Sequence, residues 1–190
     1  RDEPDAIGKS DRPEDAAQII LLSLAINYVQ EVEESFRDIG NGNPKAMEEY
    51  SKKQIDQLAD LIILTQSNIT KPERQRVMAC ITMDAHSRDV ILKTIGGKFV
   101  DVNCFWWQSQ LKHKYRKPPP GAPFLHANPS LRGKMEERAE IAICDAILPY
   151  DYEYLGNGFR LVITPLTDRI YVTATQALNL KMGCAPAGPA

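Results

Sequence analysis

The chain has 190 residues, of which 43 % are hydrophobic and 25 % charged, an ordinary globular composition with room for one sizeable core or two small ones. Its formal net charge of −2 gives no bulk electrostatic support to binding of a nucleic acid or an anionic membrane. The longest apolar run, residues 19–26, is much shorter than the ~20 residues that a membrane-spanning helix needs, and the N-terminus has no apolar secretion signal. We therefore expect neither nucleic acid nor membrane as a partner.

The cysteines and histidines are scattered along the chain. Cys80, Cys104, Cys144 and Cys184 lie 24, 40 and 40 residues apart, so no pair has the close spacing of structural zinc ligands. We therefore expect no metal site. We expect the cysteines to be reduced thiols, as in a protein of a reducing compartment.

Charged and proline-rich residues 1–13 predict a disordered segment or linker. The following apolar residues recur at three- and four-residue spacing, which predicts an amphipathic helix from Glu14 to about Asp38. The Gly-Asn-Gly-Asn-Pro turn of residues 40–44 ends it, because glycine supplies a left-handed cap and Pro44 can start the next helix.

Two further helices follow. The second is predicted from about Pro44 to Ser67. One face of it is formed by Met47, Tyr50, Gln54, Leu58, Leu61, Ile62 and Thr65. Thr70 can cap the third helix, with Glu73 three residues on in a capping-box arrangement, and Gly96-Gly97 ends it. Its apolar stripe consists of Val77, Met78, Ile81, Ala85 and Leu92. Because the turns are short, we expect the three helices to pack antiparallel.

A polar cluster, Asp84-Ala85-His86-Ser87-Arg88-Asp89, lies within the third helix and has two interpretations. His86 and Asp89 are three residues apart and share a face, as a catalytic pair would. The other interpretation is a hydrogen-bonded polar patch where the helix meets its neighbours. We favour the second, since no nucleophile or second base stands nearby.

Both tryptophans stand in the run from Phe105 to Lys117 together with five basic or potentially basic side chains. Aromatic and basic residues together can bind nucleic acid. Here the apolar and basic ends are segregated, so we favour an anchored aromatic start followed by a strand. In that strand Leu111, His113 and Tyr115 would face one way.

Prolines from Pro118 onward predict a surface loop over residues 117–138, because they remove backbone donors. Residues 139–148 predict a strand buried on both faces, paired antiparallel with residues around 109–116 across that loop.

The last forty residues are dense in structural signals. Tyr150, Tyr152 and Tyr154 alternate with acids as in a strand, and residues 156–158 form a turn. Residues 160–164 are a short strand or extended segment that Pro165 stops. Thr167 and Asp168 can cap a helix from about Asp168 to Met182, with Gly183 just past its end.

Together these elements predict a mainly α fold: an antiparallel helical bundle, then a small antiparallel β region, then the first strand and helix of an α/β module. The divisions that we expect are a disordered or linker segment 1–13, a helical subdomain 14–97, a β and aromatic region 98–155, and the start of the α/β module 156–190.

Three stretches of the last forty residues resemble dynein heavy chains: Tyr-Glu-Tyr-Leu-Gly-Asn at 152–157, Arg-Leu-Val-Ile-Thr-Pro-Leu-Thr-Asp-Arg at 160–169, and Gly-Cys-Ala-Pro-Ala-Gly-Pro-Ala at 183–190. The helix segment 84–90 and the aromatic segment 105–111 resemble the same family.

The resemblance covers roughly residues 44–190. The sequence departs from the family's usual residues at Ser87, Lys112 and Cys184, where alanine, arginine and glycine are common. The proline-rich loop also has a composition of its own.

This resemblance implies the C-terminal end of the helical linker, continuing into the first AAA+ module up to its Walker A loop, in an axonemal rather than a cytoplasmic chain. It implies a site for ATP or ADP with Mg²⁺. The residues that it assigns to the adenine side are Leu161, Val162, Pro165, Leu166 and Thr167. The residues that it assigns to the start of the Walker A loop, G-x-x-x-x-G-K-[ST], are Gly188, Pro189 and Ala190.

The Walker A lysine, the Walker B acid, the sensors and the arginine finger are absent from these 190 residues, so we expect the polypeptide alone not to hydrolyse ATP. The intact protein is expected to be an ATP-driven, minus-end-directed microtubule motor of the cilium or flagellum axoneme, a part of the cytoskeleton. Its expected partners are the rest of the heavy chain with its AAA+ ring, microtubules, and intermediate and light chains. The alternative is a helical protein-interaction module without a nucleotide role.

Overall fold

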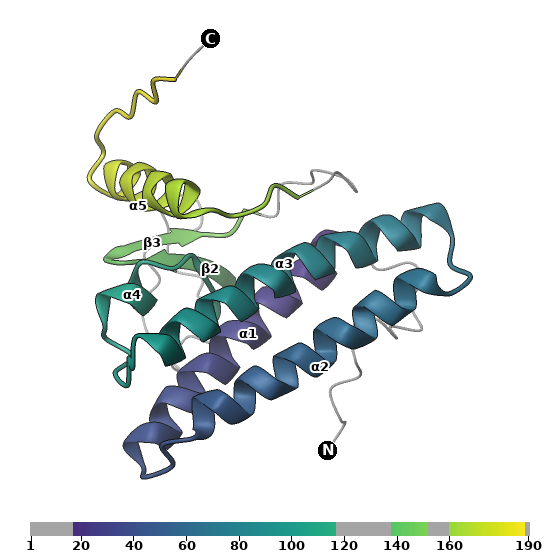
Figure 1. Cartoon of the computed structure of the whole chain (residues 1–190). Helices are drawn as coiled ribbons and strands as arrows, with labels where there is room; N and C mark the ends of the chain where they lie inside the picture. The colour runs from purple at the N-terminus through teal and green to yellow at the C-terminus, as the bar shows by residue number, and fades with distance from the viewer. Residues whose placement is uncertain (1–16, 117–137, 152–159, 189–190) are drawn as a thin grey trace.

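The computed structural model describes residues 17–116, 138–151 and 160–188. Within these residues the chain forms three layers (Figure 1): a bundle of long helices, a small sheet beside it, and a separate helix on the other side of the sheet. The mainly α fold with a small antiparallel sheet is confirmed. The predictions for residues 1–13, for the proline-rich loop up to residue 137, for the tyrosines and the turn between residues 152 and 159, and for Pro189 and Ala190 lie outside the described residues.

The bundle contains α1 (Ala17–Gly40), α2 (Ala46–Gln66) and α3 (Lys71–Gly96), joined by short turns as predicted. The capping box at the start of α3 is confirmed: Thr70 Oγ1 accepts a hydrogen bond from Glu73 N, and Thr70 N donates to Glu73 Oε2 at 2.7 Å. At the end of α3, a Cβ on Gly97 would lie 2.4 Å from the Phe99 ring, so a larger residue here would force that exposed ring to move.

The turn between α1 and α2 is longer than predicted. Gly42 has a positive φ of 104°, as expected of a glycine in this turn. Pro44 does not start α2, however, because Asn43 holds the next residues in a turn. Its side chain accepts from Lys45 N at 3.2 Å and its carbonyl accepts from Ala46 N at 3.3 Å. The helix therefore begins at Ala46.

The main core joins all three helices to the aromatic segment. Its buried members are Val29, Val32, Phe36, Met47, Tyr50, Val90, Ile91 and Trp107. The anchored aromatic start is confirmed: Trp107, in the one-turn helix α4 (Phe105–Gln108), is fully buried, and its ring lies 6.0 Å from those of Tyr28 and Phe36.

The predicted core faces of α2 and α3 were wrong in part. Ile62, Met78 and Leu92 are 44–47 % exposed. The buried face of α3 is instead mixed, and its members are Val77, Ala79, Cys80, Asp84, Ser87, Val90, Ile91 and Thr94. Polar residues can occupy it because the helix supplies hydrogen-bond partners, as where Thr94 Oγ1 donates to the Val90 carbonyl at 2.8 Å. Hydrophobicity alone therefore located most of the buried face of α2 but missed the polar part of the buried face of α3.

The sheet contains β1 (Lys112–Arg116), β2 (Arg138–Ile143) and β3 (Ala146–Pro149) in that spatial order, all antiparallel. The predicted pairing across the proline-rich loop is confirmed, with Lys112 opposite Ala142. The single strand predicted over 139–148 was wrong, because β2 and β3 form a hairpin that turns at Cys144. Cys144 adopts a positive φ of 47°, which a non-glycine residue rarely does, so the sequence did not signal the turn.

In β1 the strand alternation places His113 and Tyr115 on one face, as predicted, but the sequence did not signal that the buried residue lies on the other face. Tyr115 is 40 % exposed, whereas Lys112 is 2 % exposed. The Lys112 ammonium group is held by carbonyl oxygens at the end of α4: Nζ donates to Gln108 Oε1 at 2.7 Å and to the backbone carbonyls of Gln108 and Trp107 at 3.3 and 3.4 Å. It also lies 5.8 Å from the centre of the Trp107 ring. Lysine thus takes an interior position because its charge has local acceptors.

The sheet is fixed to α1 by two long-range contacts. Lys114 Nζ of β1 forms an ion pair with Glu33 Oε1 at 2.6 Å. Tyr150, just after β3, accepts a hydrogen bond from Gln18 Nε2 at 2.9 Å, and its ring packs edge-on against His113. The small sheet therefore connects the helical bundle to the residues that follow Tyr150.

Candidate nucleotide-binding segment

The helix α5 (Pro165–Asn179) lies on the sheet on the side away from α2 (Figure 1). Four half-buried residues, Asp168, Val172, Thr175 and Gln176, share one face of this helix. Gln176 Nε2 donates to the Ile143 carbonyl at the end of β2, at 3.0 Å. No residue of α5 is fully buried. The helix is thus attached to the hairpin by one face and leaves its other faces open.

The start of α5 differs from the prediction. Thr164, not Thr167 or Asp168, is the capping residue, and Pro165 begins the helix instead of only ending the preceding segment. Thr164 N donates to Thr167 Oγ1 at 2.7 Å, and the Thr164 hydroxyl accepts from Thr167 N at 3.4 Å. Threonine at the capping position followed by proline is the sequence signal that would have located this start.

The end of α5 also differs from the prediction. The helix ends at Asn179, and Lys181 rather than Gly183 adopts the left-handed conformation past its end, with a φ of 56°. Lys181 N donates to the Leu178 carbonyl at 3.0 Å, and Met182 N donates to the Ala177 carbonyl at 2.8 Å. This pair of bonds is a Schellman motif, which closes the helix without a glycine.

The predicted adenine-side residues lie together at the start of α5. Leu161, Val162 and Leu166 are 86, 73 and 67 % exposed, Pro165 is exposed, and Thr167 is half-buried with its hydroxyl bonded to Thr164. Residues 160–164 have no regular secondary structure, consistent with an extended segment. The arrangement is an open apolar strip that leads into a capped helix start, a flat surface of the kind that an aromatic base can contact.

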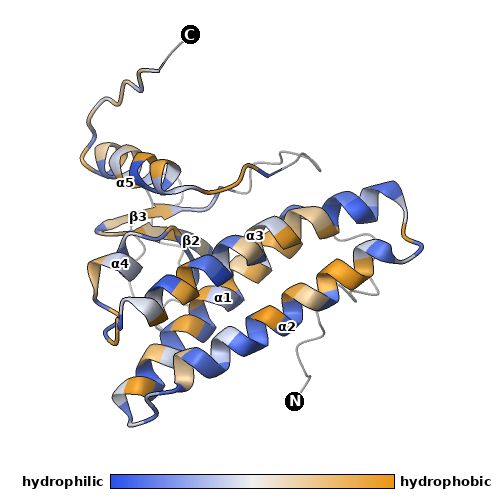
Figure 2. Cartoon of the chain, in the orientation of Figure 1, coloured by the Kyte–Doolittle hydropathy of each residue, from blue (hydrophilic) through white to orange (hydrophobic). Residues whose placement is uncertain are grey.

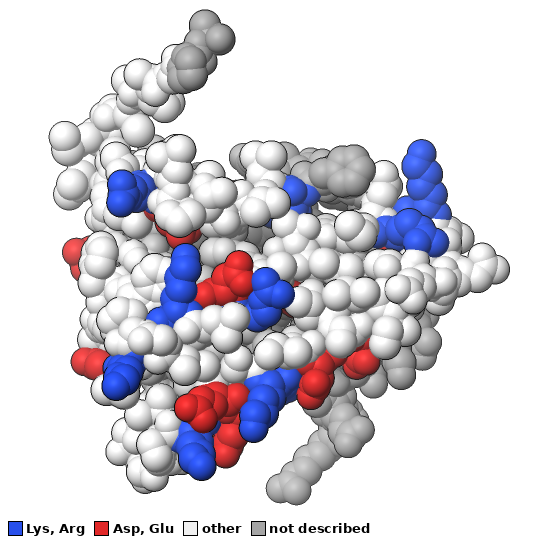
Figure 3. All heavy atoms as spheres, in the orientation of Figure 1, with Lys and Arg blue, Asp and Glu red and all other residues white. Residues whose placement is uncertain are grey.

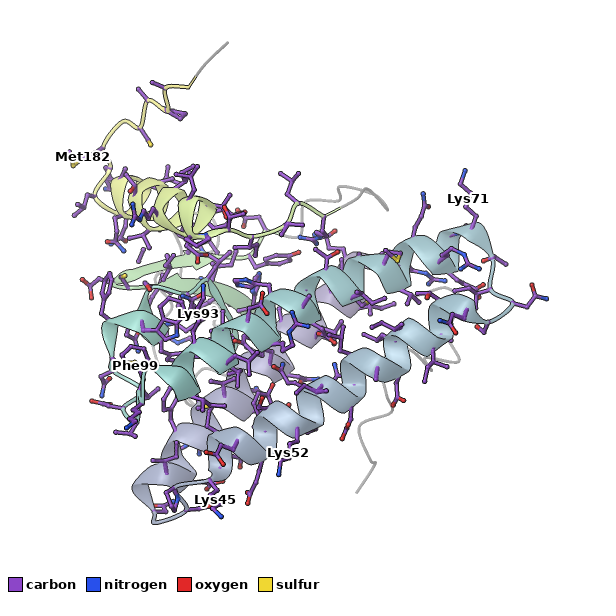
Figure 4. The ribbon with its side chains drawn as sticks, viewed as in Figure 1. Lys45, Lys52, Lys71, Lys93, Phe99 and Met182 are labelled. Carbon is purple, nitrogen blue, oxygen red and sulfur yellow. The ribbon has the colours of Figure 1, made fainter. Side chains whose placement is uncertain are left out.

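Gly188, predicted for the phosphate side, lies beyond the other end of α5. A helix of 15 residues is about 22 Å long, and the chain past Met182 leads away from the helical bundle (Figure 4). The structure therefore brings Leu161 to Thr167 together and does not bring Gly188 to them. Pro189 and Ala190 are outside the described residues.

Two charged residues of this segment affect the pKa of histidines on the bundle and the sheet, a feature that the sequence did not reveal. Burial lowers the pKa of His86 on α3, while the carboxylates of Asp168 and Asp89 oppose that shift. Burial also lowers the pKa of His113 to about 4, and the positive charge of Arg160 adds to the shift. Arg160 thus lies near His113 of β1, and Asp168 lies near His86 of α3.

The polar side chains from Asp84 to Asp89 contact different partners. Asp84 is buried and accepts from Gln57 Nε2 of α2 at 2.9 Å, and burial raises its pKa to about 6 against the opposing effect of that hydrogen bond. Arg88 forms an ion pair with Asp89 at 2.8 Å on the surface. The geometry agrees with the packing interpretation, because Asp84 and His86 face different elements.

The described ranges contain no group of three or more His, Cys, Asp or Glu side chains placed to hold a metal ion. The four cysteines are unpaired in the structure. None of the helices described is both long and apolar enough to cross a membrane.

Comparison with known proteins bears directly on this segment. The family described as the hydrolytic ATP binding site of the dynein motor region matches residues 150–190, which include the apolar strip and the whole of α5. The chain belongs to the dynein heavy-chain family.

Within that family it belongs with the axonemal heavy chains. It is 45 % identical over 174 residues to the dynein alpha chain of the flagellar outer arm of Chlamydomonas reinhardtii, and 43 % identical over 175 residues to human dynein axonemal heavy chain 17. It is 41 % identical over 174 residues to the ciliary dynein beta chain of Tripneustes gratilla. Each match covers 92 % of this chain and only 3 to 4 % of the relative.

Proposed function

We propose that residues 160–167 carry the adenine side of the first ATP site of an axonemal dynein heavy chain, and that the sheet joins this segment to the end of the force-generating linker. The observation that carries the proposal is that the matched residues and an exposed apolar stretch occupy the same part of the chain. The residues matched by the ATP-site family contain a stretch where strongly exposed apolar side chains flank a capped helix start: Leu161 and Val162 precede the cap at Thr164, and Leu166 follows it in the first turn of α5.

In this proposal Leu161, Val162, Pro165 and Leu166 contact the base, and the Thr164–Thr167 pair fixes the direction in which the helix leaves the site. The phosphate side would come from residues that include Gly188 to Ala190 and from parts of the heavy chain beyond this sequence, which also supply the ligands of Mg²⁺. Because Gly188 lies past the far end of α5, the chain returns to the nucleotide only with the rest of the module in place.

The proposed division of the chain follows from this assignment. Residues 14–97 form the helical subdomain at the end of the linker, residues 98–155 form the region that supports α5, and residues 156–190 begin the first AAA+ module. The ion pair of Lys114 with Glu33 and the hydrogen bond of Gln176 with Ile143 are the contacts that would transmit motion between them. The intact protein would be a minus-end-directed microtubule motor of the axoneme, acting with intermediate and light chains.

The test is a pair of variants in the intact heavy chain. Leu166→Asp places a carboxylate against the base and should weaken binding of a fluorescent ATP analogue by about tenfold or more, since an unpaired charge would be desolvated. Leu178→Asp is the matched control, because Leu178 is equally exposed on the same helix, 63 % against 67 %, but near its other end. Equal affinities for the two variants would remove the strip from the nucleotide site and favour an interaction module without a nucleotide role.

A further inference from the structure

The helix α2 has a second apolar stripe that the bundle does not use. Its first stripe, which includes Met47, Leu58 and Leu61, is buried against the other two helices. Its second contains Ile55, Ile62 and Ile63, which are 47, 45 and 64 % exposed. The exposed Ala59 lies between them.

The second stripe has helical spacing. Ile55, Ala59 and Ile62 follow one another at intervals of four and three residues and so form a line along the helix, with Ile63 beside it. Apolar turns of α2 alternate with polar ones on the side that faces the viewer in Figure 2. A helix that is apolar on two sides is normally covered on both. From Ile55 to Ile63 the stripe is about 12 Å long, a length that one crossing helix covers.

One edge of the stripe is acidic. Asp56 and Asp60 are exposed, four residues apart on the same side of α2, and neither forms a hydrogen bond or ion pair with any residue that the structure describes. The neighbouring Lys53 is already paired with Glu31 at 2.6 Å. Acidic groups, with basic ones between them, lie along this side of the molecule in Figure 3. The two carboxylates, which no described residue pairs, would complement a partner with positive charges on the matching edge.

We propose that this stripe is a docking face for an amphipathic helix that has lysine or arginine along one edge and belongs to another part of the same heavy chain. The relatives are many times longer than this chain, which covers only 3 to 4 % of them, so a heavy chain of that length offers many helical segments that could cover this stripe. The proposal is independent of the nucleotide site, because α2 and α5 lie on opposite sides of the sheet (Figure 1).

The experiment places the photo-crosslinking residue benzoylphenylalanine at position 62 of the intact heavy chain, with position 55 as a second site on the stripe. Glu34, exposed on α1, is the control position. After irradiation, mass spectrometry identifies the linked peptide. The expected product joins positions 62 and 55 to one heavy-chain peptide outside these 190 residues, with apolar residues at three- and four-residue spacing and lysine or arginine on one edge. Position 34 should not give that product.

A charge-reversal variant tests the acidic edge. Asp56→Lys combined with Asp60→Lys should lower the crosslinking yield at position 62 by about threefold, since exposed ion pairs contribute modestly. An unchanged yield would overturn the basic edge of the partner. Yields at positions 62 and 55 no higher than at position 34 would overturn the docking face itself. A product with tubulin, an intermediate or light chain, or a second heavy chain would overturn the assignment of its occupant.

Discussion

The helices α3 and α5 begin in the same way but differ in how much of each is buried. Both start at a threonine that forms a capping box, with proline in the first turn. Yet α3 buries side chains from Val77 to Thr94, whereas α5 has none that is fully buried and exposes Leu166, Ile170 and Leu178. Caps decide where a helix starts, and burial decides whether it is held in place. The bundle thus has a packed core of its own, whereas α5 is held by one face and by the hydrogen bond of Gln176 to Ile143.

The largest expected effect comes from making the same substitution in both helices. Ile91 of α3 is fully buried and Ile170 of α5 is 50 % exposed. Ile91→Ala should lower the free energy of unfolding of the 190-residue protein by about 2–5 kcal/mol through lost burial and a cavity. Ile170→Ala should change it by less than about 0.5 kcal/mol. Urea unfolding followed by circular dichroism measures both, and similar losses in the two variants would contradict the comparison.

Lys112 allows a test of the core by pH. Burial lowers its pKa to about 8 from the ordinary 10.5, and the positive charge of Lys114 adds to the shift. Between these two values the unfolded chain binds more protons than the folded one, so stability should rise as the pH increases from 8 to 10.5.

The rise that Lys112 contributes should be at most about 3 kcal/mol. It is measured as the difference in pH dependence of urea unfolding between the wild-type protein and Lys112→Met, which retains the apolar stem and removes the titrating group. If both proteins show the same pH dependence, the ammonium group is not held in the environment that we describe.

Much of this fold could be predicted from the sequence, because its signals are local. The spacing of apolar residues located three helices, and Thr70 with Glu73 located a cap to the residue. The sheet pairing followed from two predicted strands, residues around 109–116 and residues 139–148, that the proline-rich loop connects.

The misses have a common physical origin. Cys144 adopts a positive φ, and Asp84 and Lys112 occupy interior positions, because partners distant in the sequence or at a helix end stabilise them. A residue type reveals its propensity and not these partners. For the candidate site, the segment 161–167 was predicted by resemblance, whereas the hydrogen bond from Gln176 to Ile143 and the charges near His86 required the structure.

The most direct test of the central claim is amide hydrogen exchange in the intact heavy chain, with and without a non-hydrolysable ATP analogue and Mg²⁺. Our account predicts that the nucleotide slows exchange over residues 161–167 and leaves the interior of α3 around Ile91 unchanged, since the bundle is complete without it. Unchanged exchange over 161–167, or an equal change over α3, would contradict the account.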